Sequence, residues 1–316
     1  MKKLILDVDT GIDDAFAILY ALSQYEQVEL IGITTSFGNV LVQQATKNTL
    51  QVLELFEVDI PVYQGAAASW GNQTYTVPDS FERVHGRNGI GEYHLPIPRA
   101  TPKELTAVDF LIEAANKHQD ELIVVTLGPL TNLADALKKA PEAIQKIGKI
   151  VCMAGALTIP GNITSVAEVN VYNDAAAANY IFERLFVTVV GLDVTLQTMI
   201  TKQDIARFDR KNKKGDFLAA IAEYYYQNEY AEQDYGGALH DPLAVAIALE
   251  EGFCTSFIEL NLTVEQTDQT YGRMIGKLDE LTLIPKRTRF CLQIDATRFV
   301  DHFVESLAKF SGANNK

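Results

Sequence analysis

Short runs of β-branched and aliphatic residues alternate along this chain with stretches whose apolar residues repeat at helical spacing. The apolar runs predict strands at 3–8, 28–35, 121–127, 148–153 and 186–192. Because these runs are apolar on both faces, they favour a parallel sheet that is covered by helices on each side. The sequence therefore predicts an α/β protein with a mostly parallel, Rossmann-like central sheet.

The rest of the chain fits around this sheet. Helices are predicted at 12–24, 39–57, 103–118, 130–140, 174–183, 215–228, 241–250 and 296–310. The stretch 65–102 is rich in Gly and Pro and predicts a long irregular connection. Alternating runs predict antiparallel strands at the edge of the main sheet, at 257–264, 271–275 and 289–295. Since no Pro-, Gly- or Ser-rich linker divides the chain, we expect residues 1–316 to form a single domain.

The charge balance limits the partners. The chain has 41 Asp and Glu against 27 Lys and Arg, a net charge of −14, which disfavours nucleic acid and favours a cation or a neutral polar ligand. No stretch approaches the ~20 apolar residues of a membrane span. The apolar run that follows Met1 stops at Asp7, too early for a signal peptide. We therefore expect a cytoplasmic protein with neither a nucleic-acid nor a membrane partner.

The cysteines are few and scattered. Cys152, Cys254 and Cys291 are far apart in the sequence, odd in number and embedded in apolar runs. This pattern predicts neither a disulfide framework nor a zinc site, and it suits a reducing compartment.

Asp7, Asp9, Asp13 and Asp14 crowd the junction of the first strand and the first helix. Carboxylates this close repel one another unless they are protonated or neutralised, and a hard divalent cation such as Ca²⁺ or Mg²⁺ is the simplest neutraliser. Alternatively, Asp13 and Asp14 favour a helix N-terminus while Asp7 and Asp9 are solvated at a strand end. That alternative accounts for one or two of the acids, so we favour a metal site.

His240-Asp241-Pro242 is the second polar signal. Asp241 is expected to cap a helix whose first residue is Pro242. Taken alone, capping is the simpler interpretation. The adjacent His240 follows Gly236-Gly237 and has a side chain that can act as an acid near neutral pH.

Several polar loops follow predicted strands. The loop 161–174 contains Asn162, Glu168 and Asn170, whose amide and carboxylate groups match the hydroxyls of a vicinal diol. Its alternative interpretation is a turn-rich loop in which Asn173 caps a helix. The stretches 34–39 and 127–132 also follow strands, and ligands of such sheets bind beyond the carboxyl ends of the strands.

These motifs together resemble a known family. The run from Asp7 to Ala15 resembles the amino-terminal fingerprint of the inosine–uridine preferring nucleoside hydrolases. Further matches follow in the family's order along the chain: Thr34-Thr35 with Gly38-Asn39, the turn 127–132, Met153 through Glu168 and Asn170, and His240-Asp241-Pro242. The resemblance implies a single α/β domain, assembled into dimers or tetramers, that hydrolyses the N-glycosidic bond of small-molecule ribonucleosides with bound Ca²⁺.

The resemblance also implies a role for individual residues. The calcium ligands would be the carboxylates of Asp9, Asp14 and Asp241 and the backbone carbonyl of Leu127. Asp9 would in addition take the proton from the attacking water. The ribose would be held by Asp13, Asn39, Glu168 and Asn170 at the 2′- and 3′-hydroxyls, by Asn162 at the 5′-hydroxyl and by Met153 beneath the sugar. The crowded carboxylates would stabilise an oxocarbenium-like transition state.

On the base side, the resemblance makes His240 the acid that protonates the leaving base and gives His85 a second position beside the base. Tyr226 and Tyr230 would stack on the base or bond to it. Two features depart from the family's pattern: the spacing from Tyr230 to His240, and Ala154 and Ala156 in a run that is commonly Gly-rich.

Two other function classes stay open at this point. Asp7-Val8-Asp9 also resembles the start of the haloacid-dehalogenase phosphatase motif, although Gly11 stands where that motif has Thr or Val. A calcium-dependent ribose- or nucleoside-binding protein would keep the diol contacts without needing a leaving-group acid. The preferred base, and whether the substrate is a standard nucleoside or a ribosyl analogue, are not determined by the sequence.

Overall fold

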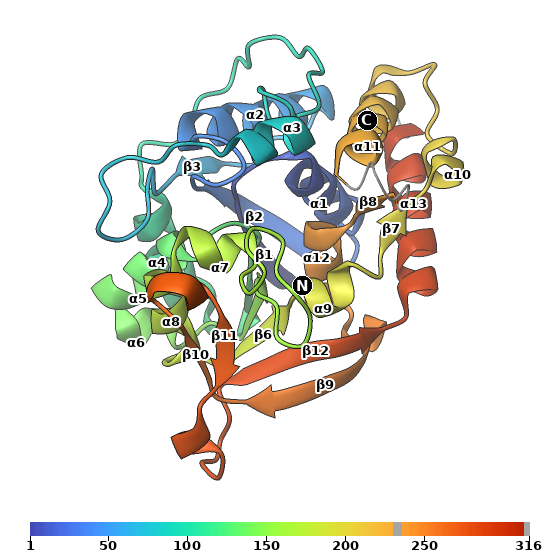
Figure 1. Cartoon of the computed structure of the whole chain (residues 1–316). Helices are drawn as coiled ribbons and strands as arrows, with labels where there is room; N and C mark the ends of the chain where they lie inside the picture. The colour runs from blue at the N-terminus through green and yellow to red at the C-terminus, as the bar shows by residue number, and fades with distance from the viewer. Residues whose placement is uncertain (230–235, 313–316) are drawn as a thin grey trace.

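The computed structural model describes residues 1–229 and 236–312 of the chain. Its centre is an eight-stranded sheet in the order β3-β2-β1-β4-β5-β6-β12-β9 (Figure 1). The strands of this sheet are β1 Lys2–Val8, β2 Val28–Thr35, β3 Val62–Gln64, β4 Leu122–Thr126, β5 Lys149–Met153, β6 Val187–Val190, β9 Cys254–Leu260 and β12 Thr288–Ile294. Neighbouring strands are parallel except β9, which pairs antiparallel with β12.

Helices cover both faces of the sheet and bury a hydrophobic core on each. One face carries α1 Ile12–Ser23, α2 Val42–Leu55, α11 Lys213–Asn228, α12 His240–Leu249 and α13 Ala296–Gly312. The other face carries α4 Ala107–His118, α5 Thr131–Lys139, α6 Pro141–Ile144 and α8 Ala175–Phe182. The predicted α/β fold with a mostly parallel sheet is confirmed. Of the described residues, no helix is both long enough and apolar enough to cross a bilayer.

Shorter elements connect these layers. The short helices are α3 Asp79–His85, α7 Val169–Asn173, α9 Leu192–Thr195 and α10 Lys202–Ile205. Single turns of 3₁₀ helix lie at η1 Gln119–Glu121, η2 Glu251–Phe253, η3 Asp268–Thr270 and η4 Leu278–Glu280. Two small antiparallel sheets pair β7 Met199–Ile200 with β8 Gly237–Ala238, and β10 Leu262–Val264 with β11 Met274–Gly276.

The strand order reverses beside β1. From β1 the chain proceeds outward through β2 to β3, and it then returns to place β4, β5 and β6 on the other side of β1. The connections that leave β1 and β4 therefore diverge at the carboxyl ends of these strands, and such a reversal leaves a crevice in which ligands of open α/β sheets bind.

The structure corrects several local predictions. The predicted strand at 271–275 does not join the main sheet, because β11 pairs only with β10 among the described strands. The predicted strand at 289–295 corresponds to β12, which is parallel to β6 and antiparallel only to β9. The connection 65–102 is not wholly irregular, since it contains α3.

Two predicted helix caps are also corrected. Asp241 does not cap α12, because that helix already begins at His240 and Asp241 lies in its first turn. Asn173 does not cap α8 either: the Asp174 carboxylate accepts a hydrogen bond from the Ala177 amide at 3.0 Å and takes that role.

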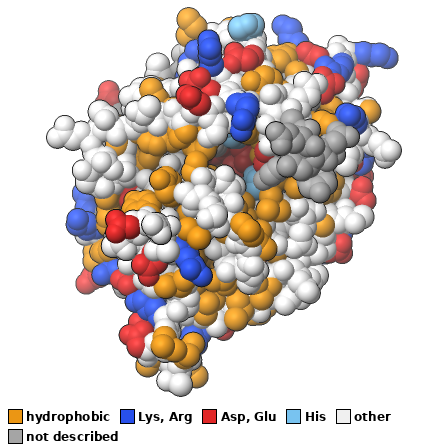
Figure 2. Space-filling view, viewed as in Figure 1, with side chains coloured by type: hydrophobic (Ala, Val, Ile, Leu, Met, Phe, Trp, Pro, Cys, Tyr) orange, Lys and Arg blue, Asp and Glu red, His pale blue; other side chains and the backbone are white. Residues whose placement is uncertain are grey.

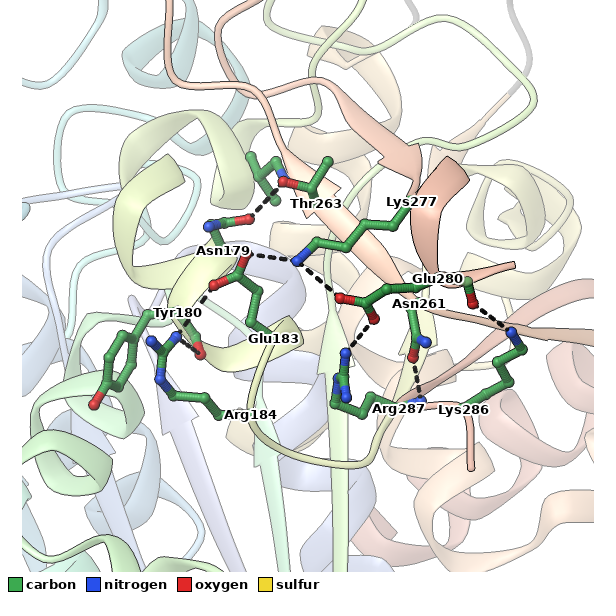
Figure 3. Close-up of polar contacts among 11 residues, drawn as sticks. Asn179, Tyr180, Glu183, Arg184, Asn261, Thr263, Lys277, Glu280, Lys286 and Arg287 are labelled. Carbon is green, nitrogen blue, oxygen red and sulfur yellow. Dashed lines mark hydrogen bonds and ion pairs between the residues drawn. The ribbon is translucent and has the colours of Figure 1, made fainter. Parts of the chain in front are cut away.

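The β10–β11 hairpin is tied to α8 by polar contacts (Figure 3). Lys277 Nζ lies 2.8 Å from a carboxylate oxygen of Glu183 and 3.4 Å from one of Glu280. The Asn179 side chain accepts a hydrogen bond from Thr263 Oγ1 at 3.0 Å. These contacts hold the hairpin against the domain although it does not belong to the main sheet.

The same hairpin supports the loop that leads to α7. A Cβ added to Gly155 would overlap Met274 Sδ, and a Cβ added to Gly272 would lie 2.9 Å from the Ala167 Cβ. Close packing against both ends of the stretch 155–167 therefore sets the position of the loop that ends at Glu168.

Candidate active site

The loop between β1 and α1 is held by Asp14. One oxygen of its carboxylate accepts a hydrogen bond from the Asp9 amide at 3.1 Å, and the other accepts from the Gly11 amide at 2.9 Å and from Asn39 Nδ2 at 3.2 Å. The bond to Gly11 satisfies an amide that the start of α1 leaves without an intrahelical partner. Asp14 thereby fixes the loop after β1 to the loop after β2.

The Asp9 carboxylate is enclosed by two glycines. Its Oδ2 accepts a hydrogen bond from the Asn39 amide at 2.7 Å, whereas its Oδ1 is buried and has no hydrogen-bond partner among the described residues. A Cβ at Gly38 would overlap Asp9 Oδ2, and a Cβ at Gly128 would lie 3.0 Å from Asp9 Cγ. The carboxylate is therefore clamped between the loops after β2 and β4, with one oxygen left open.

Asp9, Asp13, Asp14 and Asp241, here called the aspartate cluster, are all buried. Carboxylate oxygens of Asp13, Asp14 and Asp241 lie within 4.8 Å of one another. Burial, together with the charge of Asp14, raises the pKa of Asp13 to about 8, and burial and the neighbouring acids raise the pKa of Asp241 well above its ordinary value. Buried acids that repel in this way form a site that can bind a metal.

The electrostatics of the cluster fit a hard cation. Among the described residues, no Lys or Arg forms an ion pair with the aspartate cluster, and Asp13 Oδ1 is buried without a hydrogen-bond partner. The donors are all carboxylate oxygens, which suit Ca²⁺ or Mg²⁺ rather than a softer metal.

Two of the predicted calcium ligands, Asp9 and the Leu127 carbonyl, lie outside the group of three acids whose oxygens approach one another. The three acids that share a metal-sized space include Asp13 rather than Asp9. The Leu127 carbonyl accepts a hydrogen bond from Asn170 Nδ2 at 2.6 Å.

A cavity of ≈ 170 Å³ opens over the aspartate cluster. Figure 2 shows a hollow in this face of the molecule, with acidic and histidine side chains at its bottom. The cavity brings together these residues predicted from the sequence: Asp13, Asn39, His85, Leu127, Met153, Asn162, Glu168, Asn170, His240 and Asp241. Asp9 and Asp14 lie behind this surface within the cluster.

Glu168, Asn162 and Asn170, here called the amide wall, line one side of the cavity. One carboxylate oxygen of Glu168 accepts from the Asn170 amide at 2.8 Å, and the other accepts from the Gly155 amide at 2.7 Å and the Val171 amide at 3.1 Å. Glu168 thus caps α7 and fixes its own carboxylate in place. The amide wall is ordered by backbone bonds before any ligand arrives.

Another part of the cavity lining consists of His85, Tyr225, Glu229 and His240, here called the histidine wall. His240 Nδ1 lies 2.7 Å from Thr195 Oγ1, and its Nε2 lies 3.0 Å from Glu229 Oε1. Burial by itself would lower the pKa of His240, but the hydrogen bond and charge of Glu229, with smaller contributions from nearby acids, raise it overall. His240 therefore holds a proton on the nitrogen that faces Glu229.

The pKa of His85 is shifted in the opposite direction to that of His240. Its Nδ1 accepts a hydrogen bond from the Ile12 amide at 3.1 Å, so the proton of the neutral ring lies on Nε2. Burial, with a smaller effect of His240, lowers the pKa of His85 to about 3. The 3.9 Å approach of its Nδ1 to Asp13 is consequently not an ion pair at neutral pH.

The comparison with known proteins identifies this arrangement. A family model described as inosine-uridine preferring nucleoside hydrolase matches residues 4–301. The chain belongs to this family. It is accordingly a nucleoside hydrolase, an enzyme that acts on the N-glycosyl bond of ribonucleosides.

The names of the relatives specify different bases. The chain is 39% identical over 251 residues to probable uridine nucleosidase 2 of Arabidopsis thaliana, covering 78% of this chain and 77% of that protein. It is 32% identical to the pyrimidine-specific ribonucleoside hydrolase RihA of Enterobacter sp. (strain 638), covering 98% of each. A solved structure of a purine-preferring ribonucleoside hydrolase from Gardnerella vaginalis matches with a TM-score of 0.95 and 39% identity, covering 98% of this chain and 99% of that one. Overall similarity therefore assigns no base to this nucleoside hydrolase.

The tyrosines expected beside the base are placed differently. Tyr226 does not line the cavity; its ring lies 4.9 Å from Lys202 Nζ. Tyr230 lies outside the described residues. Tyr225 lines the cavity instead, with its ring centre 5.8 Å from that of His85.

Sequence reasoning also missed Glu229, Thr195 and Arg83. Glu229 and Tyr225 are four residues apart at the end of α11, so helical spacing places them on one face. That spacing was a usable signal for Glu229. Thr195 ends α9, a helix that was not predicted, and Arg83 comes from α3 within the stretch expected to be irregular.

Asp7, the first acid of the sequence cluster, is not part of the cavity lining. One oxygen of its carboxylate accepts from Thr34 Oγ1 at 2.6 Å and from Asn132 Nδ2 at 2.7 Å. Asp7 is fully buried and therefore not solvated at a strand end. Asp7 connects the ends of neighbouring strands where the strand order reverses. The acids that line or approach the cavity are those that follow it in the sequence.

Proposed function

We propose that this nucleoside hydrolase cleaves the N-glycosidic bond of ribonucleosides to free base and ribose in a calcium-dependent reaction, with Asp9 as the base and His240 as the acid. One observation supports this proposal above the others. A cluster of buried carboxylates and a proton-bearing histidine meet in a single cavity, where the strand order of the sheet reverses. Hydrolysis of a glycosidic bond needs an activated water on one side and a proton for the leaving group on the other.

The residues that would hold Ca²⁺ are Asp9, Asp14 and Asp241 through their carboxylates and Leu127 through its carbonyl. The unpartnered Oδ1 of Asp9 and the closeness of Asp14 to Asp241 support this assignment. When bound, Ca²⁺ supplies a positive charge that lowers the pKa of the attacking water. Asp13 stands equally close and adds a further negative charge to the site.

Asp9 takes the proton from water at its Oδ1. This oxygen is buried and unpartnered among the described residues, while Oδ2 is fixed by the Asn39 amide. A carboxylate with one oxygen anchored and one open is oriented for proton transfer without loss of position.

The ribose is held by Asp13, Asn39 and the amide wall, with Met153 beneath it. The Nδ2 group of Asn170 already donates to the backbone carbonyls of Leu127 and Met153. Glu168 and Asn170 therefore offer oxygen acceptors for the 2′- and 3′-hydroxyls. Asn162 lies on the same wall and would bond to the 5′-hydroxyl. Negative charge around the sugar stabilises the positive charge that develops on the ribose ring in the transition state.

His240 gives the proton of its Nε2 to the departing base. Glu229 keeps that proton in place until a base nitrogen replaces it as the acceptor, and Thr195 fixes the far side of the ring. His85 stays neutral and offers its Nε2–H to the base. Tyr225, on the same wall, contacts the base in place of Tyr226.

The enzyme is proposed to work in the cytoplasm as a homo-oligomer, a dimer or a tetramer. In support of assembly, the edge strand β9 exposes Phe257 and Ile258, at 48% and 42%. Exposed apolar side chains on an edge strand commonly mark a protein interface. The mass in solution, measured by light scattering, tests this part separately.

The activity is tested by release of free base from inosine, adenosine, guanosine, uridine and cytidine in calcium buffer without phosphate. A portion of the enzyme stripped with EDTA is the matched control. We expect release that is lost with EDTA and restored by Ca²⁺. Release that is unchanged by EDTA would contradict the metal role.

Two other results would point elsewhere. Calcium and nucleoside binding without turnover, with unchanged affinity in Asp9→Asn, would support a binding protein. Phosphate release from a generic phosphomonoester would support a phosphohydrolase.

A further inference from the structure

Two cysteines that are far apart in the sequence lie together in the fold. Cys254 begins β9 and Cys291 lies within β12, the strand that pairs antiparallel with β9. Cys254 is opposite Ile294, and Cys291 is opposite Phe257, with an irregular register between the two pairs. Both cysteines line the same small cavity, and Cys254 Sγ donates a hydrogen bond to the Ser256 carbonyl at 3.3 Å. The strand pairing thus creates a thiol pair that sequence spacing did not predict.

The thiol pair faces a small cavity of ≈ 80 Å³. Its lining includes both thiols together with the charged side chains of Lys149, Glu251 and Arg289. Among the described residues, this lining shares no member with the active-site cavity. The space is large enough for a small polar oxidant.

The two thiols differ in exposure and acidity. Cys254 is half-buried, whereas Cys291 is fully buried. The interaction with Cys291 lowers the pKa of Cys254, and the positive charge of Arg289 acts in the same direction. The interaction with Cys254 and burial raise the pKa of Cys291. An accessible thiol with a lowered pKa beside a second thiol is the arrangement that oxidants attack.

We propose that Cys254 and Cys291 are a modification site at which hydroperoxides form an intrachain disulfide, with Cys254 attacking first and Cys291 resolving. Cys254 loses its proton, and its sulfur attacks one oxygen of the peroxide. The O–O bond breaks, an S–O bond forms, and the released hydroxide takes the proton and leaves as water. Cys291 Sγ then attacks Cys254 Sγ, the S–S bond forms as the S–O bond breaks, and the Cys291 proton leaves with the second water. Both thiols are oxidised and the peroxide is reduced.

The disulfide would close the segment between β9 and β12, which carries the β10–β11 hairpin. A cross-link restricts the unfolded chain more than the folded one, so the oxidised protein should melt at a higher temperature. Because the thiol pair lies outside the active-site cavity, oxidation should leave base release within about twofold of the reduced enzyme. The proposal therefore does not depend on the proposed function.

The test treats the full-length protein with hydrogen peroxide, blocks the remaining thiols under denaturing conditions and analyses its peptides by mass spectrometry. We expect two of the three thiols to become unavailable, and a cross-linked peptide pair containing Cys254 and Cys291. Its mass should be about 2 Da below the sum of the separate peptides, and dithiothreitol should reverse the link.

Single serine variants assign the order of attack. Cys152→Ser, the matched control, should form the link as the unchanged protein does. Cys291→Ser should stop at a Cys254 sulfenic acid that dimedone traps, and Cys254→Ser should keep both remaining thiols. Three free thiols after treatment of the unchanged protein, a link to Cys152, or a link between two chains on a non-reducing gel would each overturn the proposal.

Discussion

The aspartate cluster and the histidine wall adjoin each other at the same cavity, but the chain builds them largely from different elements. Asp9 lies in the loop after β1 and Asp14 in the first turn of α1, and both carboxylates are held by backbone amides and by Asn39 from the loop after β2. His85 and Glu229 come instead from the ends of α3 and α11, away from the strand ends. Apart from the neighbours His240 and Asp241, which share the first turn of α12, the first group is positioned by the end of β1 and the second by the ends of helices.

This difference separates two tasks. Binding the metal and the sugar depends on loops that cannot shift without disturbing the sheet, because Gly38 and Gly128 press on Asp9 from both sides. Contact with the base depends on side chains that can be exchanged without moving a strand. Relatives with different base names can therefore share this fold.

The largest expected effect is on the aspartate cluster. Asp241→Ala should reduce base release by about 10³-fold or more, because it removes a proposed metal ligand. It should also abolish the rise in melting temperature caused by Ca²⁺, since only a ligand bound to the folded state stabilises it. Asp7→Asn is the matched control: Asp7 does not line the cavity, so this variant should keep the calcium shift. An unchanged calcium shift in Asp241→Ala would remove Asp241 from the metal site.

The next effect concerns the acid on the histidine wall. His240→Ala should reduce turnover of natural nucleosides by about 10²-fold, because the base would then leave without a proton. Turnover of p-nitrophenyl riboside, whose leaving group needs no proton, should fall much less. Comparable losses on the two substrates would exclude His240 as the leaving-group acid.

A smaller effect is expected from the partner of that acid. Glu229→Gln keeps the shape of the side chain but removes the charge that favours the protonated form of His240. Turnover of nucleosides should fall by about tenfold, again with little change for p-nitrophenyl riboside. Tyr226→Phe, which alters a neighbouring side chain outside the cavity, should leave both rates unchanged. A loss shared by both variants would indicate general damage to α11.

The smallest effect is a pH dependence of stability without metal. In the folded protein the pKa of Asp7 is raised to about 6 and that of Asp13 to about 8, chiefly by burial. The folded state therefore binds more protons than the unfolded state above the ordinary carboxylate pKa, and stability is lost as pH rises towards these values. The melting temperature in EDTA should fall between about pH 5 and about pH 8, and the gain on adding Ca²⁺ should grow over that range. A melting temperature that rises with pH in EDTA would contradict the repulsion within the cluster.

The contrast between residues at strand ends and residues on helices also explains which features could be predicted from the sequence. The strands of the parallel sheet and most long helices were predicted because apolar spacing is a local property of the chain. The acids after β1 and the polar residues after β4 and β5 followed from the rule that ligands bind at strand ends. Glu229 and Tyr225 were missed, since their place on the cavity depends on how α11 packs. The pairing of Cys254 with Cys291 was missed because the strands that bring them together are separated by a hairpin.

The three backbone bonds that fix the Glu168 carboxylate have a consequence for the products. A sugar-binding surface that is rigid before the substrate arrives loses little conformational entropy on binding, and this advantage does not depend on the base. Free ribose should therefore compete with every nucleoside to a similar extent.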